Sequence, residues 1–319
     1  MKNVNLVLCL HMHQPLGNFP EVVDRIVKET YRPVLDVLQK HPGISVNLHL
    51  SGVLLEMLAE RHGEVVAQLR DLVATGRVEM MTGGFYEPVL VEWAEEDRDG
   101  QLAMMAGWLK NRLGAEPLGA WLAEGVWGPS LCSSFNRAGI QYAAIDGSFF
   151  LQAGISPAKL NGHYVTDQAG DLLTVFPTCP DLARMIPHAP WDDLFGHLRR
   201  IANRGEDITL TLAANLETWP SLNGGAASYL DALFTKIEES APWIHTLTGE
   251  RRSSGKRPRG GWPYPRGRPR NWAGGRFPEQ PGGNFSGRGP NWGSGTMPPR
   301  CCLFSGADRG LPSGCVTAR

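Results

Sequence analysis

Histidine and acidic side chains recur just beyond short apolar runs, at six places in the first 250 residues. They are His11 with His13, His49, Glu87, Glu124, Asp146 and Glu217. Carboxyl groups can attack an electrophilic carbon or move a proton, and imidazoles can donate hydrogen bonds or bind a metal. Trp121 and Trp127 flank Glu124, and sugar rings stack on indole faces. These residue types favour a site at which a carboxylate reacts with a carbohydrate.

The apolar runs that precede these residues predict parallel β-strands, since helix-like patterns separate them. The predicted strands are residues 5–10, 45–50, 78–81, 120–123, 142–145, 172–176 and 208–212. The predicted helices are residues 21–40, 62–75, 101–113, 192–203 and 226–240. Most strands are apolar on both faces, which is typical of a barrel or a sheet covered on both sides. In α/β barrels the active site lies at the carboxyl ends of the strands, where the polar residues fall.

Five sequence blocks carry a resemblance to a known family. They read HMHQPLGNF at 11–19, NLHLSG at 47–52, GGFYEP at 83–88, WLAEGVWGP at 121–129 and AANLETWP at 213–220. Residues 1–245 resemble glycoside hydrolase family 57, the retaining α-glucan enzymes that include α-amylases and 4-α-glucanotransferases. The resemblance implies an incomplete (β/α)7 barrel, an α-1,4-glucan or maltooligosaccharide as substrate, and no cofactor or metal.

Retaining chemistry needs two carboxyl groups about 5–5.5 Å apart, one as nucleophile and one as acid and base. The resemblance makes Glu124 the nucleophile. It places a larger set at or near the substrate: His11, His13, Gln14, His49, Glu79, Tyr86, Glu87, Trp121, Trp127, Asp146, Glu217 and Trp219. Trp219 suits a stacking platform and the core equally well. Whether water or a sugar accepts the glycosyl group stays open.

The family's acid/base aspartate corresponds to Asn215, and an amide cannot donate or accept the proton. Gly125 also replaces the family's arginine beside the nucleophile. These departures predict a glucan-active enzyme with impaired catalysis. Three alternatives remain: Glu87 or Asp146 transfers the proton instead, the chain is a non-catalytic carbohydrate-binding relative, or it is a barrel deacetylase with a metal on His11, His13 and Asp146.

Residues 251–319 differ in composition from the rest, with 13 Lys and Arg against 2 Asp and Glu, 15 Gly and 10 Pro. Their aliphatic branched residues are too few for a core: Leu303, Leu311 and Val316. We therefore expect a barrel over residues 1–248 and an unstructured segment over 249–319. Reading residues 261–279 in another frame gives a segment that resembles the family, including W-A-L-P, which predicts a frameshift near 247–259. The resulting loss of a barrel segment predicts an unstable chain.

Composition also limits location and partners. The net charge is −1, and no stretch approaches the ~18 apolar residues of a membrane span. The six cysteines have no CxxC spacing, so we expect neither disulfides nor a zinc site. We predict a cytoplasmic protein that does not bind nucleic acid or membranes, with its first apolar run forming a buried strand rather than a signal peptide.

Overall fold

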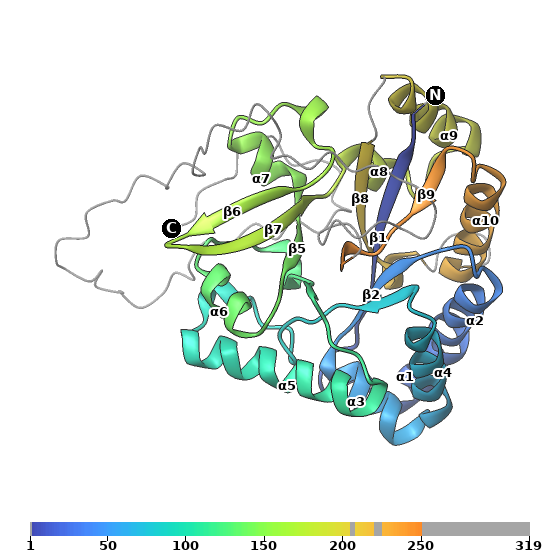
Figure 1. Cartoon of the computed structure of the whole chain (residues 1–319). Coiled ribbons are helices and arrows are strands. Elements are labelled where there is room, and N and C mark those ends of the chain that lie inside the picture. The colour runs from blue at the N-terminus through green and yellow to red at the C-terminus, as the bar shows by residue number, and fades with distance from the viewer. Residues whose placement is uncertain (1, 205–207, 220–224, 251–319) are drawn as a thin grey trace, which may run out of the picture. The chain divides into compact units, whose positions relative to one another are not determined.

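The computed structural model describes residues 2–204, 208–219 and 225–250, which form an α/β fold (Figure 1). One sheet has the strand order β3-β2-β1-β8, with β9 also paired to β1, and a second has the order β4-β5-β7-β6. Only β6 and β7 pair antiparallel among the described strand pairs. The strands are β1 (Val4–Met12), β2 (Val46–Leu50), β3 (Val78–Met80), β4 (Gly119–Ala120), β5 (Tyr142–Ile145), β6 (Tyr164–Gln168), β7 (Asp171–Pro177), β8 (Ile208–Asn215) and β9 (Ile244–Thr246).

Two isolated bridges join the sheets. Thr82, after β3, pairs with Ala120 in β4, and Thr178, after β7, pairs with Thr211 in β8. The parallel strands therefore follow one another in the ring order β1, β2, β3, β4, β5, β7, β8. All seven predicted strands are present, and the predicted α/β class is confirmed. Few backbone hydrogen bonds link β3 to β4, because these strands have only three and two residues and meet at an isolated bridge.

The central strand β1 shows how the sequence divides the core. Eight of its nine residues are buried. Successive side chains of a strand point to opposite faces, so Leu6, Leu8 and Leu10 join the large core under the helices. Val7 and Cys9 point the other way and pack with Tyr142 and others inside the ring. Burial on both faces explains why the run LVLCL at residues 6–10 is apolar throughout.

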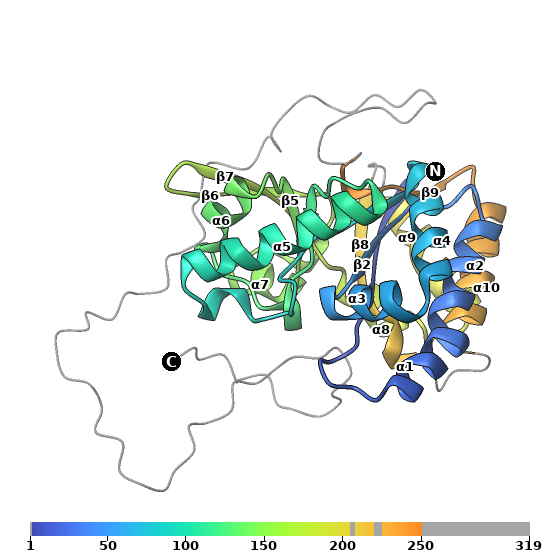
Figure 2. The same cartoon turned by 90° about the horizontal axis from the view of Figure 1, so that it is seen from below.

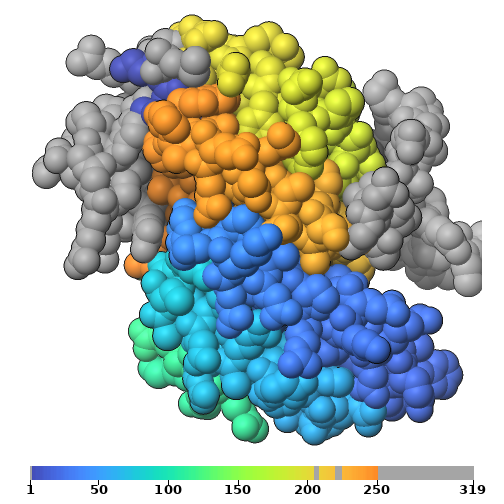
Figure 3. Space-filling model, turned by 90° about the vertical axis from the view of Figure 1, so that its right-hand side faces the viewer, coloured from blue at the N-terminus to red at the C-terminus, as the bar shows by residue number. Residues whose placement is uncertain are grey.

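Helices cover the outside of the sheets (Figures 1 and 2). They are α1 (Pro20–Ile26), α2 (Arg32–Lys40), α3 (Gly52–Arg61), α4 (Gly63–Ala74), α5 (Glu95–Leu113), α6 (Leu131–Arg137), α7 (Gly147–Gln152), α8 (Pro180–Met185), α9 (Trp191–Ala202) and α10 (Gly225–Glu239). The predicted helix 21–40 is interrupted by a π-helical turn at Val27–Tyr31. Figure 3 shows the first helices lying against α10, where Lys40 and His41 bind Asp231.

Several elements escaped sequence analysis for physical reasons. Helix α3 buries residues on most of its circumference, which blurs its periodicity, although Ser51 Oγ caps it by accepting the N–H of Leu54 (3.3 Å). Strand β6 is largely exposed and reads as a polar run, YVTDQ. Strand β9 has only three residues. Helices α6, α7 and α8 have six or seven residues, too few to show a clear period.

The chain remains packed slightly beyond the predicted boundary at residue 248. Asn47 Oδ1 accepts the N–H of Gly249 (2.7 Å), and Glu79 Oε2 accepts the N–H of Glu250 (2.9 Å). Sequence analysis predicts a frameshift near 247–259 and an unstructured segment over 249–319. From residue 251 on, both predictions fall outside the described residues. In the described part, no helix has the length and apolar character that crossing a bilayer requires.

Candidate active site

Three histidines meet at the carboxyl ends of β1 and β2. Parallel pairing places His11 opposite His49, and His11 Nδ1 lies 2.9 Å from His49 Nδ1. His13 lies two residues beyond His11, so both project from the same side of the strand. The indole of Trp121 stacks on His11, with ring centroids 4.6 Å apart, and is nearly parallel to it. The strand ends and the loop after β4 thus build a wall of planar rings.

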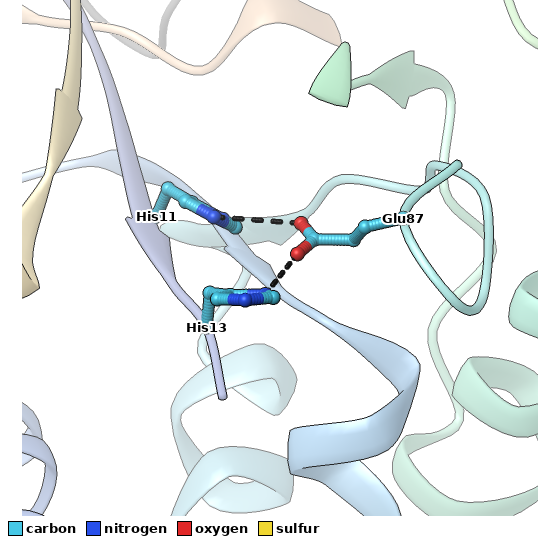
Figure 4. A group of neighbouring side chains, drawn as sticks. All are labelled: His11, His13 and Glu87. Atoms are coloured by element: carbon cyan, nitrogen blue, oxygen red, sulfur yellow. Dashed lines mark ion pairs between the residues drawn. The ribbon is translucent and has the colours of Figure 1, made fainter. Parts of the chain in front are cut away.

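Glu87 faces this wall from the loop after β3 (Figure 4). Its Oε1 lies 3.4 Å from His11 Nε2, and its Oε2 contacts His13 Nδ1 at very short range. Glu87 has a φ of 52°, a left-handed conformation that costs a non-glycine residue on the order of 1 kcal/mol or more. The loop therefore holds its carboxylate towards the two imidazoles at some expense in backbone energy.

The pKa values of the two histidines that face Glu87 are shifted in opposite directions. Burial lowers the pKa of His11 to about 4, although the charge of Glu87 opposes this. A hydrogen bond to Glu87 raises the pKa of His13, because His13 is less buried and gains an anionic partner. At neutral pH His11 is neutral, whereas the contact with Glu87 favours the protonated form of His13. Burial also lowers the pKa of His49 well below its ordinary value, so His49 is neutral too.

This group has the donor types of a metal site. One ligand atom each from His11, His13 and Glu87 lies within 4.8 Å of the other two, and two imidazoles with a carboxylate suit zinc or another divalent metal. The deacetylase alternative used Asp146 with the same histidines. Asp146 instead begins α7, where its Oδ1 accepts the N–H of Ser148 (2.7 Å). Glu87, rather than Asp146, is the carboxylate beside both imidazoles.

Glu217 approaches His13 from the end of β8. Strand pairing places Asn215 opposite His11, so Glu217 lies at the level of His13. Its Oε1 accepts the N–H of His13 (2.6 Å) and the hydroxyl of Tyr31 (2.6 Å). Gln14 Nε2 donates to the Tyr31 oxygen (2.7 Å). Burial raises the pKa of Glu217, and the bonds from Tyr31 and His13 oppose that rise.

Glu124 lies in the short turn Ala123–Gly125 after β4 and is exposed. Its φ of 55° is again left-handed, so both carboxylates that follow β3 and β4 have strained backbones. The charge of Glu124 is one of those that raise the pKa of His13, together with the charges of Glu87 and Glu217. Three carboxylates from three loops therefore surround one histidine.

Comparison with known proteins gives this arrangement a family. A model of glycosyl hydrolase family 57 matches residues 7–260. The chain belongs to glycosyl hydrolase family 57. The resemblance predicted from the five sequence blocks is therefore confirmed.

Named relatives of this family 57 chain act on α-glucans. An alpha-amylase of Pyrococcus abyssi is 38% identical over 206 residues, covering 65% of this chain and 31% of that relative. A 4-alpha-glucanotransferase of Thermococcus litoralis is 39% identical over 190 residues, covering 60% and 29%. A crystal structure of 4-alpha-glucanotransferase from Thermococcus litoralis matches with a TM-score of 0.71 at 33% identity, covering 80% of this chain and 39% of that one. The match spans about a third of the two curated relatives.

Asn215, which sequence analysis predicts to correspond to the acid/base aspartate of family 57, has a local structural role. Its Oδ1 accepts the N–H of Glu217 (3.0 Å) and so caps the turn Leu216–Thr218. An amide can make this bond as well as a carboxylate can, which explains how the turn keeps its shape without an aspartate. The structure thus gives Asn215 a capping role in this turn.

Other predicted substrate residues have mixed locations. Gln14 is buried, and its side-chain amide donates to the Tyr31 hydroxyl oxygen. Trp127 is half-buried and follows the Glu124 turn in the sequence. Tyr86 is 49% exposed beside Glu87. Trp219 is only 4% exposed and packs edge-to-face on Tyr229, so it lies in the core rather than presenting a stacking face.

Glu79 lies apart from the histidines, inside the ring of strands. The hydroxyl of Tyr142 donates to its Oε1 (2.7 Å), and burial raises its pKa to about 7. The same hydroxyl oxygen lies 3.0 Å from Asn47 Oδ1, the more distant of its two neighbouring acceptors. No contact between Glu79 and the histidines is seen among the described residues. Glu79 therefore belongs to a polar group beneath the site that we call the floor, formed by Asn47, Glu79 and Tyr142.

Sequence analysis missed one residue of the site, Tyr31. It is buried on the π-helical turn, and its hydroxyl reaches Glu217 while Gln14 binds its oxygen. In the sequence it reads as one more apolar position of a helix that is predicted to be continuous. A π-turn widens the helix by one residue and often accompanies a functional site. Its only signal in the sequence is Arg32-Pro33, since a proline favours a new helical start.

Proposed function

We propose that this chain acts on α-1,4-glucans or maltooligosaccharides by a retaining double displacement in which Glu124 is the nucleophile. Family membership and the names of the relatives support the substrate class. The observation that carries the proposal is the gathering of Glu87, Glu124 and Glu217 around His13 at the strand ends. A retaining mechanism needs two of these carboxyl groups.

Each group in the site has a task in this reaction. Glu124 is exposed on a strained turn, so its carboxylate is accessible to an anomeric carbon. His11 and His13 donate hydrogen bonds to sugar hydroxyls, with Glu87 fixing both rings. Water as acceptor gives hydrolysis, and the 4-hydroxyl of a second glucan gives transfer. No cofactor takes part in either outcome.

A trapping experiment tests the nucleophile. A 5-fluoro-α-glucosyl or α-maltosyl fluoride carries a leaving group that needs no protonation, so glycosylation of Glu124 should be visible by peptide mass spectrometry. Glu124→Gln should abolish the adduct. Glu116→Gln, which changes an exposed carboxylate bonded to Lys110, is the matched control and should leave it intact. A folded wild-type chain that forms no adduct contradicts the proposal.

A non-catalytic glucan-binding protein is the second candidate, and Asn215 favours it. Loss of general acid–base catalysis typically costs 10²–10⁴-fold in rate. Such a protein would bind maltoheptaose by calorimetry, yet it would form no adduct at Glu124 with the activated fluoride. The same two measurements therefore separate an enzyme from a binding protein.

A further inference from the structure

The structure narrows the choice of a proton-transfer group in this site. Glu87 presents both carboxylate oxygens to histidines, so it is engaged in ion pairing. Asp146 caps α7 with its Oδ1. Glu79 is bound in the floor by Tyr142 and by the N–H of Glu250. Of the two carboxylates that sequence analysis suggested as substitutes for position 215, Glu87 is thus paired with histidines, and Asp146 is engaged through one oxygen as the cap of α7.

Glu217 differs from Glu87 in its second oxygen: Glu87 Oε1 has no hydrogen bond but lies 3.4 Å from His11 Nε2, whereas Glu217 Oε2 has no ion-pair partner among the described residues. Glu217 Oε1 is fixed by two donors, His13 N–H and the Tyr31 hydroxyl. Oε2 is buried and has no hydrogen-bond partner within the part of the chain that the structure describes. Burial disfavours the charged carboxylate, so this environment favours the protonated form of Glu217. The two donors to Oε1 fix the orientation of the group, and Oε2 is the oxygen that no protein donor engages within the described residues.

The position of Glu217 also fits the task. It lies two residues after Asn215 on the same strand end, and it contacts the backbone of His13. The charges of Glu217 and Glu124 both act on the His13 ring. His13 thus has a potential nucleophile on one loop and Glu217 on another.

We propose that Glu217 is the general acid and base of this site, replacing the group that Asn215 lacks. This inference rests on the proposed function with Glu124 as nucleophile. In the first step Glu124 attacks the anomeric carbon, the glycosidic C–O bond breaks, and the proton on Glu217 Oε2 passes to the leaving oxygen. In the second step Glu217 takes a proton from water or a sugar hydroxyl, whose oxygen displaces Glu124 from the anomeric carbon. Both groups then return to their starting states.

The protonated form that the first step needs is favoured by burial, which raises the pKa of Glu217. Tyr31 is the positioning residue, since its hydroxyl holds Oε1 and leaves Oε2 to carry the proton. Tyr31 has one hydroxyl proton, and Glu217 Oε1 at 2.6 Å is nearer than the His13 carbonyl at 3.0 Å. The bond also lowers the pKa of Glu217, so loss of the hydroxyl should raise it.

The test compares Glu217→Gln with wild type on two substrates. Turnover of maltooligosaccharides should fall 10²–10⁴-fold. α-Maltosyl fluoride should still glycosylate Glu124, because fluoride leaves without a proton, and the adduct should accumulate. Azide, an anion that needs no base, should then release it as α-maltosyl azide of retained configuration. Glu238→Gln, near the end where strands begin, is the matched control and should behave as wild type.

Two further variants guard against a merely structural role. Tyr31→Phe should move the alkaline limb of the kcat/KM profile to higher pH, which a packing defect would not do. Asn215→Asp should change glucan turnover less than 10-fold. The inference is overturned if Glu217→Gln keeps wild-type glucan turnover, if azide has no effect on a folded Glu217→Gln, or if Asn215→Asp gains 100-fold. A wild type that never labels Glu124 overturns the proposed function, and this inference with it.

Discussion

Glu79 makes the stability of the chain depend on pH in a way that can be calculated. Burial raises its pKa from 4.5 to about 7 in the folded state, while an unfolded chain restores the ordinary value. The folded protein therefore holds this proton up to about pH 7. The stabilisation is complete below pH 4.5 and is lost between pH 4.5 and 7. At 1.36 kcal/mol for each pKa unit, the loss is about 3 kcal/mol.

Substitution Glu79→Gln should remove this dependence, because an amide keeps the oxygen acceptor and does not ionise. Urea denaturation of both proteins, followed by tryptophan fluorescence at several pH values, gives the difference in unfolding free energy. That difference should shift by about 3 kcal/mol in favour of Glu79→Gln between pH 4.5 and 7.5. The variant Glu116→Gln, at an exposed carboxylate paired with Lys110, controls for the loss of a carboxylate. A difference that stays constant with pH would refute the reasoning.

Three other substitutions test separate contacts. Glu87→Gln should lower the pKa of His13 towards 6.5, since the ion pair raises it; an unchanged imidazole titration by NMR would show that no pair forms. Gly119→Ala should destabilise the chain by about 1–3 kcal/mol, because its Cβ would lie 2.1 Å from the Tyr142 ring; a wild-type denaturation midpoint would contradict this close approach. Ser51→Ala should cost about 1 kcal/mol by removing the cap of α3, and the same measurement checks it.

The strands were predictable because a strand that is buried on both faces appears in the sequence as a continuous run of apolar residues. The run LVLCL at residues 6–10 can be apolar at every position only if both sides of β1 are covered, as they are. Elements that bury only one side, or that have few residues, give a weaker apolar pattern. Strand β6 is exposed, and β9 has three residues, so neither stands out from the loops around it.

In the site, the positions of several residues could be predicted from local sequence, but their contacts with distant residues could not. The spacing of His11 and His13 and the strand-end position of Glu87 predicted residues that do meet. Which partner each would take depends on contacts between distant loops, such as Tyr31 with Glu217, and these have no local signature. Trp219 illustrates the limit, since an indole suits a sugar or a core equally well until its neighbours are known.

The floor has a consequence for where the chain can be cut. Asn47 accepts the main-chain N–H of Gly249, and Glu79 accepts that of Glu250. A Cβ at Gly249 would lie 2.2 Å from the Tyr142 ring. Residues 249 and 250 therefore pack against the buried polar side chains of the floor. A protein shortened to residue 246 would let water reach a buried carboxyl group and an amide, so the smallest unit able to close its own interior extends at least to residue 250.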